Sequence, residues 1–287
     1  MSLSVLASVY QHANQSGRVA LYGVGRSARY QRAPESDLIN RGLWREISSA
    51  TLYSSRDAHT TLLLFGFPFG LVNLPDYSGR FVQFTNPGSG SELDINVPAG
   101  LNDLTDSMLL VATNRATETR LSYRDLFLDR WKTTIDGKLS GGAKRAGDPV
   151  LTWEMFPRAI SHLDPNRTYL KVHQKLDIEI DWWPDYEASI TYHIFLHLDG
   201  GGRLRGFVAR WAYWIEGGAK SDDIEDRLAP AVIAGMTDLD GQLSSLLGAL
   251  PFTFRDLYYL PGRQLSPAGA GTLTGWTTDD VTIVLAS

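Results

Sequence analysis

The chain has 287 residues, of which 43% are hydrophobic and 21% are charged, and its formal net charge at pH 7 is -5. This composition is typical of a globular protein, and at roughly 150 residues per domain the length predicts two domains. The mild negative charge disfavours the phosphate backbone of a nucleic acid or an anionic membrane as the main partner. The absence of cysteine excludes disulfides, thiolate metal sites and a cysteine nucleophile.

The first residues form a short, mildly apolar start with no basic residue ahead of it. Polar side chains such as Ser4, Ser8 and Gln11 interrupt this apolar run. We therefore expect no signal peptide and a cytoplasmic location. No stretch approaches the ~20 consecutive apolar residues that a membrane-spanning helix needs, so we also expect no transmembrane segment.

From residue 17 onward, short aromatic or β-branched runs alternate with clusters of Gly, Pro, Ser and Asn. These runs predict strands at 19–23, 27–31, 47–53, 60–66, 81–85, 92–96 and 107–113. Short strands with this punctuation are typical of an antiparallel sandwich rather than a parallel α/β sheet. The runs also repeat, because each half ends in a strand preceded by serine: Ser48 and Ser49 in the first half, and Ser107 in the second.

A tight aromatic corner, Tyr77-Ser78-Gly79, stands in the second half. Together with the repeated runs it resembles the two Greek-key motifs of a βγ-crystallin domain. Each motif of that family has four strands, an aromatic-x-Gly corner near its first hairpin and a serine before its fourth strand. The corner needs glycine because a Cβ would collide with the ring or because the turn requires a positive φ. It has no clear counterpart in the first half.

The resemblance covers residues 17–114 and implies a microbial or fungal type of member with degenerate motifs. Family members that bind calcium carry two Asn or Asp residues, two spacers, then Ser or Thr, and Ser. The matching segment here is 102–107, and the metal ligands that the resemblance implies are Asn102, Asp103, Asp106 and Ser107. Asp106 replaces the usual hydroxyl residue, yet a carboxylate also suits calcium. The alternative is a polar turn that bonds its own backbone.

The matching segment of the first half, 44–49, has Trp44 and Arg45 where oxygen ligands belong. Because Arg45 would repel a cation, we expect this half to bind no metal. Calcium is therefore an optional ligand at most, and we expect that the protein requires no cofactor.

The remaining residues, 115–287, predict an α+β domain that resembles no family we know. The polar segment 114–122 predicts a linker, 121–135 a helix with Ser122 as its N-cap, and 136–149 an exposed flexible loop. Alternating patterns at 168–181, 189–198 and 203–215 predict an antiparallel meander. Helical spacing follows from residue 221 to 250, with Pro230 and Gly235 expected to kink or break it. A last strand is predicted at 280–286.

The fold class predicted is therefore mainly β. A two-Greek-key, βγ-crystallin-like sandwich occupies residues 1–114. An α+β domain with an antiparallel meander and packed helices occupies residues 115–287.

Catalytic motifs are lacking, since the chain has no G-x-S-x-G, H-E-x-x-H or dinucleotide-binding sequence. His193 and His197 share one strand face, but a spacing of about 13 Å is too wide for a common metal. His173 can neighbour one of them, with Glu179 as the carboxylate of a site. An ordinary polar sheet face is the favoured alternative, and we expect no enzyme.

An excess of aromatic residues marks the second domain. We nominate four as a binding surface for sugar, lipid or protein: Trp182, Trp183, Trp211 and Tyr213. Packing in the core is the alternative.

The function expected is that of a non-enzymatic structural or stress-related crystallin-like protein that binds calcium weakly if at all. The alternative is a carbohydrate- or membrane-binding protein, toxin- or lectin-like, that uses the Trp-rich C-terminal domain. A glycan, lipid or protein partner and the oligomeric state stay open.

Overall fold

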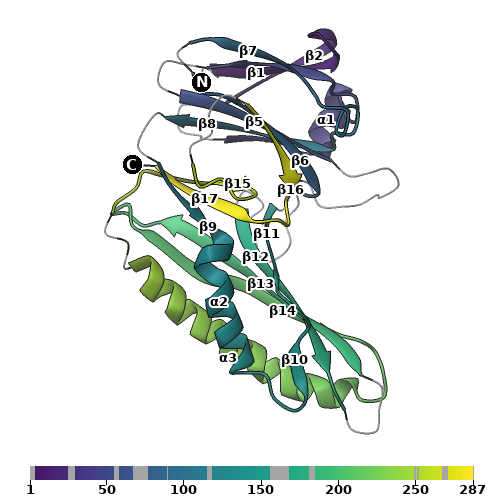
Figure 1. Cartoon of the computed structure of the whole chain (residues 1–287), viewed down its shortest axis with the longest axis vertical. Coiled ribbons are helices and arrows are strands. Elements are labelled where there is room, and N and C mark those ends of the chain that lie inside the picture. The colour runs from purple at the N-terminus through teal and green to yellow at the C-terminus, as the bar shows by residue number, and fades with distance from the viewer. Residues whose placement is uncertain are drawn as a thin grey trace.

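The structure is a computed structural model that describes residues 4–24, 30–54, 58–66, 77–88, 90–114, 118–155, 168–180, 185–248, 250, 252–266 and 271–286. Strands make up 51% of it, and they form four antiparallel sheets with three helices. The prediction of a mainly β protein with antiparallel sheets is therefore confirmed (Figure 1).

Two sheets pack together in the N-terminal part. The first has the order β2-β1-β4-β7 and consists of β1 (Ser4–His12), β2 (Ser16–Val24), β4 (Ser49–Tyr53) and β7 (Glu92–Asn96). The second has the order β16-β6-β5-β8-β3 and consists of β3 (Tyr30–Ala33), β5 (Ala58–Gly66), β6 (Arg80–Asn86), β8 (Ser107–Asn114) and β16 (Gly271–Trp276). The short helix α1 (Glu35–Arg41) connects β3 to β4.

The strand order divides these sheets into two quartets, β1 to β4 and β5 to β8. Each quartet gives its first, second and fourth strands to one sheet and its third strand to the other sheet. The two quartets are therefore interlocked, because neither sheet can form from one quartet alone.

The strand β1 was not predicted, because the first strand expected from the sequence was 19–23. Its pairing with β2 shifts register between Val5 and Ala7. A bulge of this kind interrupts the two-residue alternation that predicts a strand, and Ala and Ser add little strand propensity. The predicted strand at 19–23 lies inside β2, the second strand of its quartet.

The corner predicted at Tyr77-Ser78-Gly79 joins β5 to β6, with φ of 59° at Tyr77 and 87° at Gly79. The backbone N–H of Tyr77 donates to Ser107 Oγ at 2.8 Å. The first quartet has a counterpart after all, in the turn between β1 and β2. There φ is 56° at Gln15 and 79° at Gly17, and the N–H of Gln15 donates to Ser49 Oγ at 3.0 Å.

The central strands of the second sheet, β6, β5 and β8, are buried on both faces. Alternate residues of β5, such as Leu62 and Leu64, pack in the core between the two sheets, whereas Leu63 and Phe65 belong to the core of the C-terminal part. All four side chains are fully buried. One continuous core thus runs from this sheet into the rest of the molecule.

The third and fourth sheets form the C-terminal part. The third has the order β15-β17-β9 and consists of β9 (Glu118–Ser122), β15 (Asp256–Pro261) and β17 (Val281–Ala286). The fourth, named the long sheet here, has the order β10-β12-β13-β14 with β11 also beside β12. Its strands are β10 (Ala143–Arg145), β11 (Val150–Met155), β12 (Thr168–Ile178), β13 (Tyr186–Leu198) and β14 (Leu204–Ile215).

The helices α2 (Tyr123–Asp136) and α3 (Ser221–Gly248) cover one face of the long sheet (Figure 1). Ser122 caps α2 as predicted, since its Oγ accepts the N–H of Asp125 at 3.0 Å. The expected break at Pro230 or Gly235 is wrong, because α3 is continuous through both. Gly235 instead makes room for Tyr192, whose hydroxyl lies 3.0 Å from where a Cβ would stand and donates to the Val232 carbonyl at 2.5 Å.

Two segments that the sequence predicted to be irregular connections contain β-strands. Residues 118–122 of the expected linker form β9 and pair with β17. Residues 143–145 of the expected flexible loop form β10 and pair with β12.

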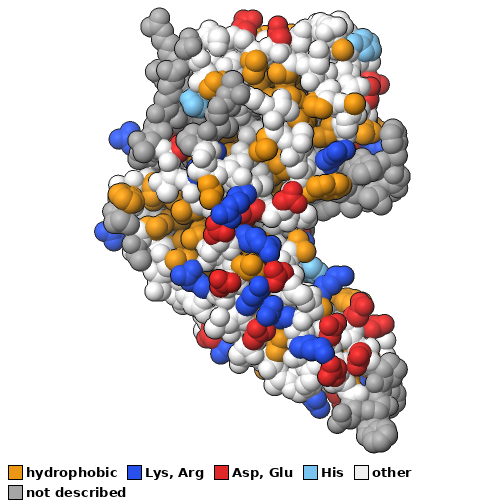
Figure 2. Space-filling model, in the orientation of Figure 1, with side chains coloured by type: hydrophobic (Ala, Val, Ile, Leu, Met, Phe, Trp, Pro, Cys, Tyr) orange, Lys and Arg blue, Asp and Glu red, His pale blue; other side chains and the backbone are white. Residues whose placement is uncertain are grey.

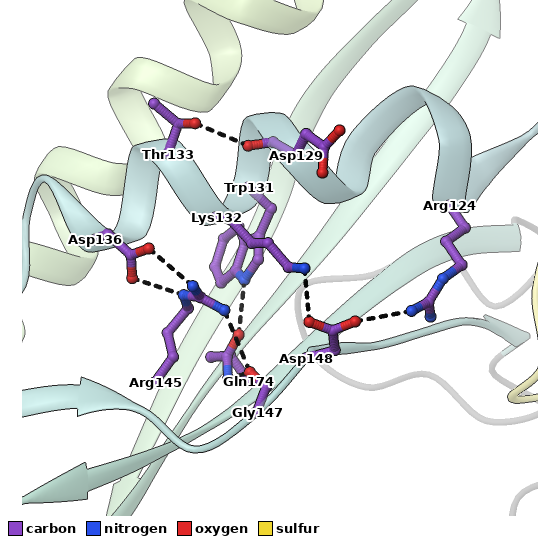
Figure 3. Close-up of polar contacts among 10 residues, drawn as sticks. All are labelled: Arg124, Asp129, Trp131, Lys132, Thr133, Asp136, Arg145, Gly147, Asp148 and Gln174. Atoms are coloured by element: carbon purple, nitrogen blue, oxygen red, sulfur yellow. Dashed lines mark hydrogen bonds and ion pairs between the residues drawn. The ribbon is translucent and has the colours of Figure 1, made fainter.

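Figure 3 shows how α2 is held to this second segment: Arg145 reaches Asp136 with two hydrogen bonds of 2.6 and 2.8 Å, and Asp148 bridges Lys132 and Arg124. In the same view, the buried Trp131 ring donates through Nε1 to Gln174 Oε1 at 3.1 Å.

The boundary expected near residue 114 is crossed in several places. The strand β16 comes from the last fifth of the chain and pairs with β6 along its whole length. Trp153 Nε1 donates to the Tyr77 carbonyl at 3.0 Å, and the buried amides of Gln83 and Gln264 bond to each other at 2.9 and 3.0 Å.

Candidate functional site

The candidate calcium loop lies beside the corresponding loop of the first quartet, and the two contact each other reciprocally. Arg45 Nε lies 2.7 Å from Asp106 Oδ1, and the N–H of Arg45 donates to the Thr105 carbonyl at 3.0 Å. In the opposite direction, Ser48 Oγ donates to Asp103 Oδ1 at 2.8 Å, and the N–H of Asp103 donates to the Ile47 carbonyl at 3.4 Å.

The four residues proposed as metal ligands therefore have separate partners. Asp106 binds the guanidinium of Arg45, whereas Asn102 donates to Asp103 Oδ2 at 2.8 Å. Ser107 is buried and holds the Tyr77 corner through its hydroxyl. Asn102 and Asp103 contact each other, and among the described residues no group of three or more His, Cys, Asp or Glu is placed to hold a metal ion.

Arg45 adopts a positive φ of 54°, matching the 55° of Asp103 in the other loop. Its side chain is only 24% exposed, and that of Asp106 is 20% exposed. A fixed cation thus already lies against the carboxylate that the sequence nominated as a calcium ligand. The guanidinium is well suited to this position because it stays protonated and presents several N–H groups to a carboxylate.

The nominated aromatic surface divides between two settings. Trp182 and Trp183 lie outside the described residues. Trp211 and Tyr213 stack with their ring centroids 6.1 Å apart, on the face of β14 that packs against α3. The Tyr213 hydroxyl donates to Glu225 of that helix at 2.5 Å. These two rings are therefore partly buried packing elements between the sheet and the helix.

The opposite face of the long sheet, named the open face here, carries a cluster of ionisable side chains from three adjacent strands. His193 on β13 lies opposite Lys171 on β12, and both contact Glu154 on β11. His193 Nε2 is 2.7 Å from Glu154 Oε2. Burial alone would raise the pKa of Glu154, but the hydrogen bonds from His193 and Lys171 outweigh it and hold that pKa below its usual value.

The sequence expected His173 and Glu179 near these histidines, and the geometry is different. His173 Nδ1 is paired with Thr191 Oγ1 at 3.0 Å, and Glu179 binds Lys144 at the far end of β12. The carboxylate that does reach His193 is Glu154, which the sequence analysis missed. The alternation of Leu151 and Trp153 with Thr152 and Glu154 was the available signal.

Aromatic rings continue along the open face beyond this group. The Phe195 ring contacts the rings of Tyr169, His197 and Phe207, with centroid separations of 5.6 to 5.7 Å. The row ends in solvent, where Phe207 is 42% exposed, and on the same face Trp214 is 55% exposed. Among the described residues of the long sheet, Phe207 and Trp214 are the exposed large aromatic side chains, in place of the nominated Trp211 and Tyr213.

On the face of the molecule that carries α2, Lys and Arg side chains are interleaved with Asp and Glu rather than segregated (Figure 2). No helix among the described residues has both the length and the apolar character to cross a membrane. Comparison of the chain with models of protein families, with curated proteins and with solved structures finds no match.

Proposed function

We propose that this chain is a non-enzymatic structural protein built on a βγ-crystallin-type sandwich of two Greek keys. In it, an internal ion pair replaces calcium as the brace between the two motif loops. The observation that carries this proposal is the reciprocal contact of the two loops, in which Arg45 binds Asp106 and Ser48 binds Asp103.

The strand order supports the family part of the proposal. Each quartet exchanges its third strand, β3 or β7, with the other sheet. Each quartet also has a turn with positive φ, at Gln15 or Tyr77, held by the serine that opens its fourth strand. The same turn, held by a serine in the same position, thus occurs in both quartets. Two related Greek-key motifs would share such a feature.

The structural role follows from the interlocking of the quartets. Because each sheet needs a strand from both quartets, neither quartet can open without disrupting the other. Contacts between distant parts of the chain also make folding slow, because loop-closure entropy is lost before those contacts form. Resistance to unfolding is the property that a structural protein needs, and it is measurable as a slow unfolding rate.

The experiment is calorimetric unfolding of the intact chain, with calcium and with a chelator, beside the Arg45→Ala variant. A ligand that binds the folded state raises the melting temperature by mass action. We expect the native protein to melt at the same temperature in both buffers, and Arg45→Ala to melt lower. A saturable calcium-dependent rise of the native melting temperature would overturn the bracing role given to Arg45.

A second candidate function is carbohydrate recognition by the open face. The observation that favours it is the exposure of Phe207 and Trp214 beside polar and basic side chains such as Arg205 and His173. Exposed rings flanked by hydrogen-bonding groups suit the apolar faces and hydroxyls of sugars.

A glycan array, with liposomes as a parallel probe, tests this second candidate. Trp214→Ala should abolish a glycan signal, whereas Trp276→Ala should not, because Trp276 is similarly exposed at 43% but lies on β16. Binding to liposomes but not to glycans would mean that the ligand of the open face is a lipid rather than a sugar. If the protein binds neither, the open face is not a recognition surface for these ligands.

A further inference from the structure

A cavity of about 120 Å³ opens at the end of the long sheet, lined by residues of β10, the end of β12 and the N-terminal half of α3. Figure 1 shows where these three elements lie in the fold. Its floor is apolar, and the residues that form it are Leu139, Ala143, Ile178, Ile180, Ile224 and Leu228. Ile178, Ile224 and Leu228 are each 4% exposed and belong to the main core. A cavity of roughly 150 Å³ with such a lining holds one benzene molecule. The volume therefore suits a single ring or a short acyl chain.

The rim of this cavity is charged, and the described residues that line it include two cations, Lys220 and Arg227, and one anion, Asp223. Lys220 binds Asp223 at 2.7 Å, which leaves Arg227 as the additional cation. Arg227 makes no hydrogen bond or ion pair within the described part of the chain, and it acts on Asp223 only through longer-range attraction.

The Arg227 guanidinium is placed over the turn that precedes β10. A Cβ on Gly141 would lie 3.1 Å from Arg227 Nη1, and the φ of Gly141 is 63°. The glycine thus lets the guanidinium lie at the cavity mouth with N–H groups available to a ligand. Arginine is the side chain that best binds a carboxylate, through two parallel hydrogen bonds.

From the apolar floor and the unpaired cation at its mouth we infer that this cavity binds a small amphiphilic carboxylate. The apolar tail, a short acyl chain or one aromatic ring, occupies the floor. The carboxylate binds Arg227, with Lys220 contributing positive charge. This function is separate from the proposed structural role, because the cavity shares no residue with the two motif loops.

The test is isothermal titration of the intact protein with octanoate, below its micelle concentration, beside the neutral 1-octanol and the cationic octylamine. We expect octanoate to bind saturably at one site and octylamine not to bind. Arg227→Gln should weaken octanoate binding about tenfold, which is the size expected for one charge-assisted hydrogen-bonded contact. Arg203→Gln is the matched control, since it removes an exposed arginine from the hairpin at the opposite end of β13.

A second pair of variants tests the floor. Ala231 lines the cavity from α3, so Ala231→Phe should fill it and abolish binding. Ala231→Leu serves the same purpose if the phenylalanine variant fails a circular dichroism check of folding. The inference is overturned if octanoate does not bind saturably, if it binds the filled variant as tightly as the native protein, or if octylamine binds equally well.

Discussion

Ser107 has the clearest individual role, because its buried hydroxyl holds the corner at Tyr77 through a 2.8 Å hydrogen bond. Replacing it with alanine removes the acceptor from a buried backbone N–H, which costs about 1 to 3 kcal/mol. We expect Ser107→Ala to lower the free energy of unfolding by that amount in urea denaturation. Ser49→Ala should have a similar effect at Gln15. Ser54→Ala should be close to neutral, because the Ser54 hydroxyl makes only a solvent-exposed hydrogen bond, to the Ser91 carbonyl.

If Ser107→Ala were as stable as the native protein, the serine would not hold the corner. That result would also weaken the proposed relation between the two quartets, since the same serine device in both is part of its support.

A pH dependence follows from the open face. Burial lowers the pKa of His173 from its usual 6.5, and the charges of Lys171 and Lys175 lower it further. His173 therefore binds a proton more readily in the unfolded state than in the folded state. As a result, the folded state loses stability as the pH falls from about 6.5 towards the lower pKa that His173 has in the folded protein. Glu154, whose pKa is also lowered in the folded protein, loses its contribution in the same direction at more acidic pH.

We expect the free energy of unfolding to decrease between pH about 7.5 and about 5.5, and to decrease less in His173→Gln, which keeps a polar group beside Thr191. Urea denaturation at these two pH values measures both slopes. Equal slopes for the two proteins would show that His173 does not contribute.

At the residue scale, the sequence predicted which positions are special better than it predicted their partners. The Tyr77 corner and the Ser122 cap have the expected local roles because each acts within its own turn or helix end. Ser107, nominated as a metal ligand, instead accepts a hydrogen bond from the N–H of Tyr77 in a distant turn. The partners of Asp106 and His193 could not be predicted, because Arg45 and Glu154 reach them from strands or loops about 40 to 60 residues away. Nothing in a local pattern encodes such contacts.

At the scale of elements, the N-terminus of α2 is fixed from two directions. Ser122 Oγ accepts the N–H of Asp125 and donates to Asp280 Oδ2 at 2.5 Å, while Asp280 Oδ1 accepts the N–H of Arg124 at 3.0 Å. Asp280 lies directly before β17, so this contact ties the helix to the third sheet.

Ser122→Ala should therefore cost more than the roughly 1 kcal/mol of an ordinary N-cap, because a buried carboxylate also loses a donor. We expect a loss of about 2 kcal/mol in urea denaturation. Thr133→Ala on the exposed side of the same helix is the matched control and should change little. A loss no larger than that of Thr133→Ala would mean that Asp280 fixes the helix without the serine.

The elements that the sequence predicted well are the ones with a strong regular pattern. The meander strands β12 to β14 and the helix α2 have nearly uninterrupted periodicity, and they form close to the predicted bounds. At α3 the helix forms close to the predicted bounds, but the predicted break is wrong. The usual cost of an internal proline is outweighed there by the burial of Leu228, Val232 and Leu239 along one helix face.

On the scale of the whole molecule, the sequence suggested two parts but not the way in which they join. The strand β16 has mostly exposed side chains, so no apolar pattern marks it as a strand. It forms because its backbone pairs with the edge of β6, about 190 residues earlier in the chain. The sequence also could not show that alternate residues of β5 face two different cores, because a strand that is buried on both faces has a continuous apolar sequence.

Adjacent leucines on β5 test whether the two parts unfold together. Leu62 and Leu63 are both fully buried, but Leu62 packs between the N-terminal sheets and Leu63 packs in the C-terminal core. Truncating a buried leucine to alanine costs about 2 to 5 kcal/mol. Because the second sheet belongs to both cores, we expect the intact protein to unfold in one calorimetric transition, with calorimetric and van't Hoff enthalpies equal.

In that case Leu62→Ala and Leu63→Ala should each lower the melting temperature of the same single transition. If the parts were independent, Leu62→Ala would lower only an N-terminal transition and leave a second transition in place. The two variants remove the same side chain from the same strand, so strand propensity and surface effects cancel between them. If one variant showed more unfolding transitions than the other, the difference would show which core each leucine stabilises. Two separate transitions in either variant would contradict a shared core.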